Sequence, residues 1–204
     1  MSSFDTSDYF YKAIIFDCDG TLVNSAPLHF SAFQTALRKQ GVVIDHDWYM
    51  ERLALSRVEL ITKFSETIKV DLDILRAAAD SESQFMIRSG ELAEITDVVD
   101  IARANYGKVP MAVASSGQKS SVNMMLENLS INYLFDSILT ADDVSACKPD
   151  PEIYRLAADK LQIDTADCLV FEDTEEGLAS AASAGAQFVD VRTFASIYTK
   201  KVPA

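Results

Sequence analysis

The sequence has few cysteines and none at the close spacing of a metal or redox site. Its three cysteines, Cys18, Cys147 and Cys168, are far apart and odd in number. A disulfide framework or a zinc site needs cysteines in paired arrangements, so we expect a reduced compartment. The N-terminus lacks the basic and then apolar stretches of a signal peptide. Together these features predict a cytoplasmic location.

Long apolar runs and positive charge are also scarce. No run approaches the roughly 20 apolar residues of a membrane-spanning helix, so we expect no membrane partner. The 18 basic and 31 acidic residues give a net charge of −13. This balance disfavours nucleic acid and anionic membranes, although a small anionic substrate needs only a local positive site. The 204 residues are enough for one large domain or for a domain with an insertion.

The apolar pattern differs between two parts of the chain. Residues of about 26 to 92 carry helical patterns throughout and no strand pattern. The helices predicted there cover residues 27–40, 47–55 and 72–88, with another that begins at Ser56, where Glu59 completes a capping box. We interpret this stretch as an inserted all-helical domain.

The remainder alternates between strand and helix. The predicted strands cover residues 13–16, 110–114, 137–140, 168–171 and 188–191, and the predicted helices cover residues 97–105, 119–129, 151–161 and 174–184. Alternation of this kind is typical of a parallel sheet with helices on both faces. The sequence therefore predicts an α/β protein. Its Rossmann-like core comprises residues 1–25 and 93–204, and its helical cap comprises residues 26–92.

Polar residues follow four of the predicted strands. Because an active site in such a sheet lies at the carboxyl ends of the strands, we expect these residues to meet at one edge. Each also has an ordinary explanation, such as a helix cap at a serine or a solvated surface lysine. Four in succession are hard to explain by chance. The residues are Asp17 and Asp19, Ser115 and Ser116, Lys148, and Glu172 and Asp173.

The chemistry of these side chains suits phosphoryl transfer. Two carboxylates within three residues, Asp17 and Asp19, repel each other and call for a cation between them. Carboxylates are the ligands that Mg²⁺ prefers. Lys148 and Ser115 can donate to phosphoryl oxygens, and a carboxylate can act as the nucleophile.

These motifs resemble those of the haloacid dehalogenase superfamily, in the β-phosphoglucomutase-like branch, which has a helical cap after the first strand. The likeness covers nearly the whole chain. Its motifs are Asp-x-Asp-Gly-Thr at residues 17–21, Ser115, Lys148-Pro149 and Glu172-Asp173. Within the branch the sequence is most similar to small bacterial phosphatases that act on fructose 1-phosphate or 6-phosphogluconate.

The resemblance implies a role for each core residue. Asp17 would be the nucleophile, and Asp19 would protonate the leaving alcohol and then activate water. Ser115 and Lys148 would hold the phosphoryl group. The Mg²⁺ ligands would be Asp17, the Asp19 backbone carbonyl and Asp173, with Glu172 close by.

The resemblance also implies substrate contacts in the cap and near the nucleophile. His29 falls where the branch has a histidine just inside the cap. Arg57 falls where the mutases have an arginine for the distal phosphate of the substrate. Thr21 and Ser116 are the substrate-side candidates in the core motifs. His29 and Arg57 also have ordinary explanations, as a polar residue on a helix face and as a cover for a helix start.

We therefore predict a Mg²⁺-dependent phosphatase for a small phosphorylated sugar or related metabolite, acting through an aspartyl-phosphate. A β-phosphoglucomutase-type mutase is the first alternative. Thr21 favours the phosphatase, because mutases often have Val or Ile there. A catalytically silent binding or regulatory protein is the second alternative, and the intact Asp17, Asp19, Ser115, Lys148 and Asp173 argue against it. We expect a monomer or a weak homo-oligomer.

Overall fold

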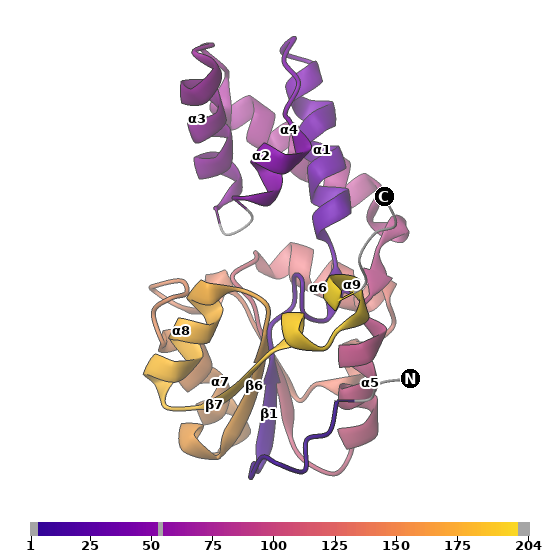
Figure 1. Cartoon of the computed structure of the whole chain (residues 1–204), viewed down its shortest axis with the longest axis vertical. Helices are drawn as coiled ribbons and strands as arrows, with labels where there is room; N and C mark the ends of the chain where they lie inside the picture. Colours follow the sequence, from indigo (N-terminus) through magenta and orange to yellow (C-terminus); the bar gives the residue numbers. More distant parts are fainter. Residues whose placement is uncertain (1–3, 53–54, 200–204) are drawn as a thin grey trace. The chain divides into compact units, whose positions relative to one another are not determined.

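The computed structural model describes residues 4–52 and 55–199. Within these, the chain divides into two compact units (Figure 1). The sheet unit comprises residues 4–24 and 93–199, and the helical unit comprises residues 25–52 and 55–92. Among the described residues, no helix is long and apolar enough to cross a membrane.

A five-stranded parallel sheet forms the centre of the sheet unit. Its strand order is β5-β4-β1-β6-β7, so the first strand lies in the middle. The strands are β1 (Ala13–Phe16), β4 (Met111–Ala114), β5 (Ser137–Leu139), β6 (Cys168–Glu172) and β7 (Gln187–Asp190). This sheet, with the helices beside it, confirms the predicted α/β fold class.

The three central strands are buried on both faces. Every residue of β1, β4 and β6 is buried, which explains their continuous apolar runs. In register, Phe16 pairs with Val113 on one side and with Phe171 on the other. The Phe16 and Phe171 rings stack with centroids 5.2 Å apart. The three central strands therefore end within one residue of one another, so the loops that follow them begin at the same edge of the sheet.

Helices cover the two faces of the sheet. Ile15 and Ala112 pack with Ile153 and Ala157, which lie on the apolar side of α7. Figure 1 shows α7 and α8 on one face and α5 on the other. The helices of the sheet unit are α5 (Thr96–Asn105), α6 (Lys119–Asn128), α7 (Glu152–Leu161), α8 (Glu175–Ala184) and α9 (Ser196–Thr199).

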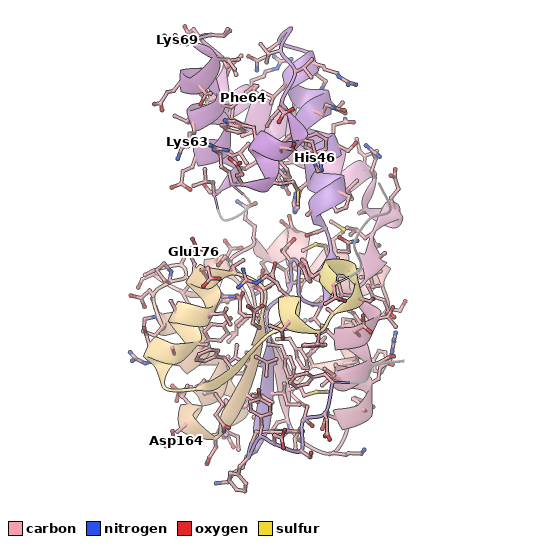
Figure 2. All side chains as sticks on the ribbon, viewed as in Figure 1. His46, Lys63, Phe64, Lys69, Asp164 and Glu176 are labelled. Carbon is pink, nitrogen blue, oxygen red and sulfur yellow. The ribbon has the colours of Figure 1, made fainter. Side chains whose placement is uncertain are left out.

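The helical unit has its own apolar core. Phe64, labelled in Figure 2, lies against Trp48 with ring centroids 5.2 Å apart. Phe33, Leu37 and Ile61 complete the centre of this core. The helices are α1 (Ala26–Arg38), α2 (His46–Met50), α3 (Arg57–Ile68) and α4 (Ile74–Ile87).

The structure differs from the predicted elements in a few places. The helix predicted over residues 47–55 is the short α2, whose start is fixed by Asp45 accepting from the Trp48 amide at 2.9 Å. Residues 53–54 of that prediction lie outside the described residues. Ser56 forms the predicted capping box with Glu59. The sequence missed α9 and the two-residue strands β2 (Val23–Asn24) and β3 (Ala93–Glu94), which pair antiparallel.

Candidate active site

The loop after β1 is a tight turn that presents Asp17. The carbonyl of Cys18 accepts from the amides of Leu22 and Val23, both at 2.9 Å, so the chain reverses at once. Gly20 has a φ of +82°, a conformation that side chains disfavour. A Cβ on Gly20 would also lie 2.1 Å from Asp173 Oδ2. Only glycine therefore allows this turn and the Asp173 carboxylate to lie so close together.

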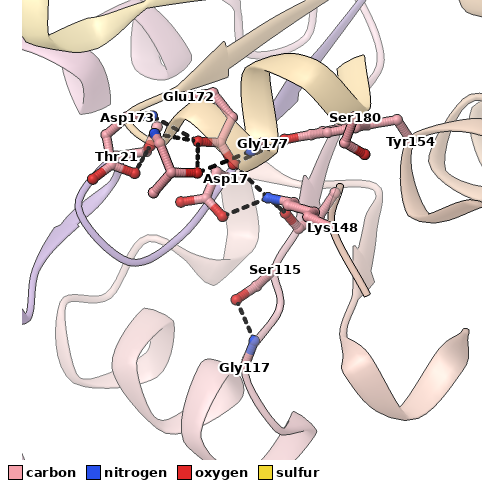
Figure 3. A network of polar contacts seen from close by, with 12 residues as sticks. Asp17, Thr21, Ser115, Gly117, Lys148, Tyr154, Glu172, Asp173, Gly177 and Ser180 are labelled. Carbon is pink, nitrogen blue, oxygen red and sulfur yellow. Dashed lines mark hydrogen bonds and ion pairs between the residues drawn. The ribbon is translucent and has the colours of Figure 1, made fainter. Parts of the chain in front are cut away.

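Lys148 connects the loop after β5 to the other motifs (Figure 3). Its ammonium donates to Asp17 Oδ1 at 2.7 Å, to Glu172 Oε1 at 2.7 Å and to the Ala114 carbonyl at 2.9 Å. The Lys148 side chain is only 4% exposed. All three donors of the ammonium are thus used by residues at the ends of β1, β4 and β6, which fixes its position.

Glu172 is the most constrained carboxylate of the site. Its Oε1 accepts from Lys148 and, at 3.2 Å, from the Tyr154 hydroxyl. Its Oε2 accepts from the Asp173 and Thr174 amides at 2.8 Å and from the Thr174 hydroxyl at 2.9 Å. A Cβ on Gly177 would lie 1.8 Å from Glu172 Oε1. The first turn of α8 therefore needs glycine there to accommodate this carboxylate.

The pKa values of the ionisable side chains in the site are strongly shifted. Burial lowers the pKa of Lys148, but Asp17, Tyr154 and Glu172 together outweigh it, so the pKa lies well above the usual range. Burial raises the pKa of Glu172, yet Lys148 and the Thr174 hydrogen bonds bring it below its ordinary value. Burial also raises the pKa of Asp17, and Lys148 opposes this rise. For Asp173, burial and then Glu172 raise the pKa to about 7.

The carboxylates of the site fit a magnesium ion. Asp17, Glu172 and Asp173 each offer an oxygen, and these ligand atoms all lie within 4.8 Å of one another. The Lys148 ammonium contacts Asp17 and Glu172 and does not balance all three carboxylates, so a divalent cation would offset the remaining negative charge. Oxygen donors of this kind are the ligands that Mg²⁺ prefers. Glu172 is the weakest of the three candidates, because its oxygens already accept several hydrogen bonds.

The remaining predicted core residues also lie at this edge of the sheet. Ser115 is buried, and its Oγ accepts from the Gly117 amide at 3.0 Å. A Cβ on Gly117 would lie 3.2 Å from that Oγ and 3.6 Å from Asp19 Oδ2, so Ser115 and Asp19 flank the same glycine. Ser116 is exposed. The buried Thr21 donates to Asp173 Oδ1 at 3.4 Å, so its hydroxyl faces a predicted metal ligand.

The two predicted substrate residues of the helical unit lie in one cluster. The His29 ring stacks on Phe85 with centroids 4.0 Å apart and planes 2° from parallel. The Arg57 guanidinium lies 5.8 Å from the centroid of the same ring. Arg57 also donates to Ser81 Oγ at 3.0 Å and pairs with Glu82 at 2.7 Å. Both residues thus have partners within the helical unit, and their contacts with substrate stay a prediction.

Sequence reasoning missed two residues that support the site. Tyr154 is buried on α7, with Lys148 Nζ 4.9 Å from its ring centroid. The apolar face of α7 was predictable, and a tyrosine on a buried face needs a polar partner for its hydroxyl. The second residue is Gly177. No pattern in the sequence marks it, because the close approach of Glu172 follows from the packing of α8 against β6.

Residues 11–185 match the family model of the haloacid dehalogenase-like hydrolases. The match spans most of the chain, and the parallel sheet and the aspartate-lysine site agree with it. The chain therefore belongs to this family. The predicted family, fold and enzyme class are confirmed.

Relatives from bacteria cover most of the chain. The fructose-1-phosphate phosphatase YqaB of Escherichia coli K12 is 28% identical over 182 residues, which are 89% of this chain and 97% of that protein. A crystal structure of CbbY from Rhodobacter sphaeroides in complex with phosphate is 28% identical, with a TM-score of 0.77 over 87% of this chain and 84% of that one. β-Phosphoglucomutase from Clostridium difficile shares the fold, at 24% identity and a TM-score of 0.71 over 88% and 84% of the two chains.

Proposed function

We propose that the protein is a Mg²⁺-dependent phosphatase that hydrolyses a small phosphorylated sugar or a related metabolite. The observation that carries the proposal is the Lys148 ammonium, 2.7 Å from both Asp17 and Glu172 in a buried site. This arrangement places a positive charge beside the carboxylate that we take as the nucleophile, and transfer of an anionic phosphoryl group requires such a charge. The phosphatase named among the relatives supports the same substrate class.

Asp17 attacks phosphorus in the proposed reaction. The P–O bond to the sugar breaks as the Asp17–phosphorus bond forms, and Asp19 donates its proton to the leaving alkoxide. Asp19, now a carboxylate, takes a proton from water, and that water attacks the aspartyl-phosphate. Phosphate leaves and Asp17 is restored.

Other residues of the chain hold the reacting groups. Lys148 holds one Asp17 oxygen by a hydrogen bond, and its positive charge offsets negative charge on the phosphoryl group. The Ser115 hydroxyl binds a phosphoryl oxygen. Glu172 keeps Lys148 in place by accepting its second hydrogen bond. Asp17, the Asp19 carbonyl and Asp173 would hold Mg²⁺, with Glu172 nearby. When bound, the ion neutralises negative charge on the carboxylates and the phosphate.

We further propose that the helical unit is a cap that excludes bulk water from the reacting groups and selects the substrate. Arg57 and His29 are its candidate contacts, and Thr21 and Ser116 are those of the sheet unit. The predicted monomer or weak homo-oligomer stays part of the proposal.

A panel of phosphorylated metabolites, assayed for released phosphate with Mg²⁺ and with a chelator, tests the proposal. We expect release from sugar monophosphates that requires Mg²⁺ and stops on chelation. Isomerisation of glucose 1-phosphate without release would favour the mutase. No phosphate release and no isomerisation would favour a binding or regulatory protein with the same fold.

A further inference from the structure

The chain returns to the active site after its last strand. Past β7, a 3-10 turn over Val191–Thr193 leads into α9, which lies beside the carboxyl end of the sheet (Figure 1). The Ser196 amide donates to Asp97 Oδ2 at 2.7 Å, and Ala195 is fully buried. This segment lies beyond residues 11–185, which match the family model. Two contacts, at Ala195 and Ser196, thus anchor it to the sheet unit.

Tyr198 on α9 reaches two of the loops that build the site. Its hydroxyl lies 2.7 Å from the Gly20 carbonyl oxygen and 3.2 Å from Asp173 Oδ2. Gly20 belongs to the loop after β1, and Asp173 follows β6. A phenol carries one proton and can also accept, so this hydroxyl can donate to only one of these oxygens at a time. It still lies within hydrogen-bond distance of both.

The Tyr198 hydroxyl adds a partner to a carboxylate that otherwise has one long side-chain hydrogen bond. Asp173 Oδ1 accepts from Thr21 at 3.4 Å, a long hydrogen bond that holds the carboxylate only weakly. The backbone of Gly20 closes off one side, since a Cβ there would meet Asp173 Oδ2. The Tyr198 hydroxyl lies within hydrogen-bond distance of the same Oδ2. Partners of this kind set the orientation of a metal-binding carboxylate.

We propose that Tyr198 is a positioning residue that orients Asp173 to bind Mg²⁺. The inference rests on the proposed function, because it takes Asp173 as a ligand of the ion. Tyr198 itself acts through Asp173 and through the Gly20 carbonyl. The C-terminal segment of this chain thereby contributes to a site whose other residues come from the loops after the strands.

Titration of the full chain with MgCl₂ by isothermal calorimetry tests the inference in the absence of substrate. The Tyr198→Phe variant keeps the ring and removes only the hydroxyl. We expect its affinity for Mg²⁺ to fall about tenfold, in line with the loss of a partner of a metal ligand. Its melting temperature without Mg²⁺ should match that of the wild type. Tyr133→Phe, which changes a tyrosine that is 57% exposed, should leave the affinity unchanged.

The outcomes separate this inference from the function beneath it. Equal affinities of the wild type and Tyr198→Phe would overturn the role of Tyr198 and leave the Mg²⁺ site intact. No binding by the wild type would overturn both. A lower melting temperature of the metal-free variant, with no specific loss of affinity, would assign Tyr198 to packing alone. As a second readout, the Mg²⁺ concentration for half-maximal phosphate release should rise in Tyr198→Phe, with the rate at saturating Mg²⁺ largely retained.

Discussion

The two units of the protein each contain a cation beside a carboxylate, but the two pairs differ in burial. In the sheet unit, Lys148 is 4% exposed and Glu172 is 1% exposed. In the helical unit, Arg57 is 19% exposed and Glu82 is 31% exposed. Both N···O distances are 2.7 Å. Distance alone therefore does not distinguish them, whereas access to water does.

Burial determines how many hydrogen bonds each ion pair needs and how costly the pair is to break. Desolvated charges need a full set of hydrogen bonds, and Lys148 and Glu172 have them. The Arg57 pair is partly hydrated, so it can be broken or rearranged at small cost. The sheet unit thus holds a fixed charged site, which we propose as the reaction centre, and the helical unit offers groups that can change partners. This contrast agrees with a division of labour between chemistry and substrate selection.

The largest expected effect tests the nucleophile in the fixed centre. Asp17→Asn removes the attacking carboxylate with almost no change in shape, so kcat should fall at least about 10³-fold. Circular dichroism should show an unchanged fold. Asp71→Asn, at an exposed carboxylate of the helical unit, should keep full activity. Phosphate release by Asp17→Asn at the wild-type rate would contradict the proposed mechanism.

Removal of the buried cation tests how much the buried ion pairs contribute to the free energy of unfolding. Lys148→Met leaves the Asp17 and Glu172 carboxylates buried without their partner, so the free energy of unfolding should fall by about 3–5 kcal/mol. Urea denaturation without Mg²⁺ measures this loss. In the control Lys12→Met, an exposed pair with Asp167 is broken, and the free energy of unfolding should change little, because water screens this pair. If both variants lost a similar free energy of unfolding, burial would not explain the difference between the two kinds of ion pair.

The space around Glu172 provides a third test. Gly177→Ala places a methyl group 1.8 Å from Glu172 Oε1, so the free energy of unfolding should fall by about 1–3 kcal/mol. In an unobstructed helix the same change would stabilise by up to about 1 kcal/mol, so the sign of the effect is itself informative. Gly90→Ala is the matched control, because no atom lies within 4 Å of its added Cβ. A stabilised Gly177→Ala variant would contradict the crowding seen at Glu172.

The smallest effects are expected in the helical unit. Glu82→Gln should change the free energy of unfolding by at most about 1 kcal/mol, because its pair with Arg57 is partly exposed. Arg57→Gln should raise KM for the best sugar phosphate with little change in kcat, as expected for a contact made equally in the ground and transition states. Steady-state kinetics of both variants, beside their urea curves, provide the comparison. An unchanged KM in Arg57→Gln would leave Arg57 as a structural residue of the helical unit.

Much of the architecture was predictable because its signals are local. The buried strands are continuous apolar runs, and the motifs at Asp17, Ser115 and Asp173 directly follow three of them, whereas Lys148 lies further along the loop after β5. Parallel strands in register then bring Asp17, Ser115 and Asp173 to one edge without further information. The capping box at Ser56 is equally local, since it spans four residues. The strands β2 and β3 escaped prediction because two residues are too few for a periodic pattern.

The sequence by itself determined the family, the parallel sheet and the edge at which the charged residues meet. Only the tertiary structure decided which oxygen each donor reaches. Lys148 bridges Asp17 and Glu172, Thr21 faces Asp173, and Arg57 pairs with Glu82. Tyr198 approaches Gly20 from 178 residues away along the chain. Strand and helix patterns record which side of an element is buried, whereas hydrogen-bond partners depend on how separate elements pack, and no local pattern encodes that.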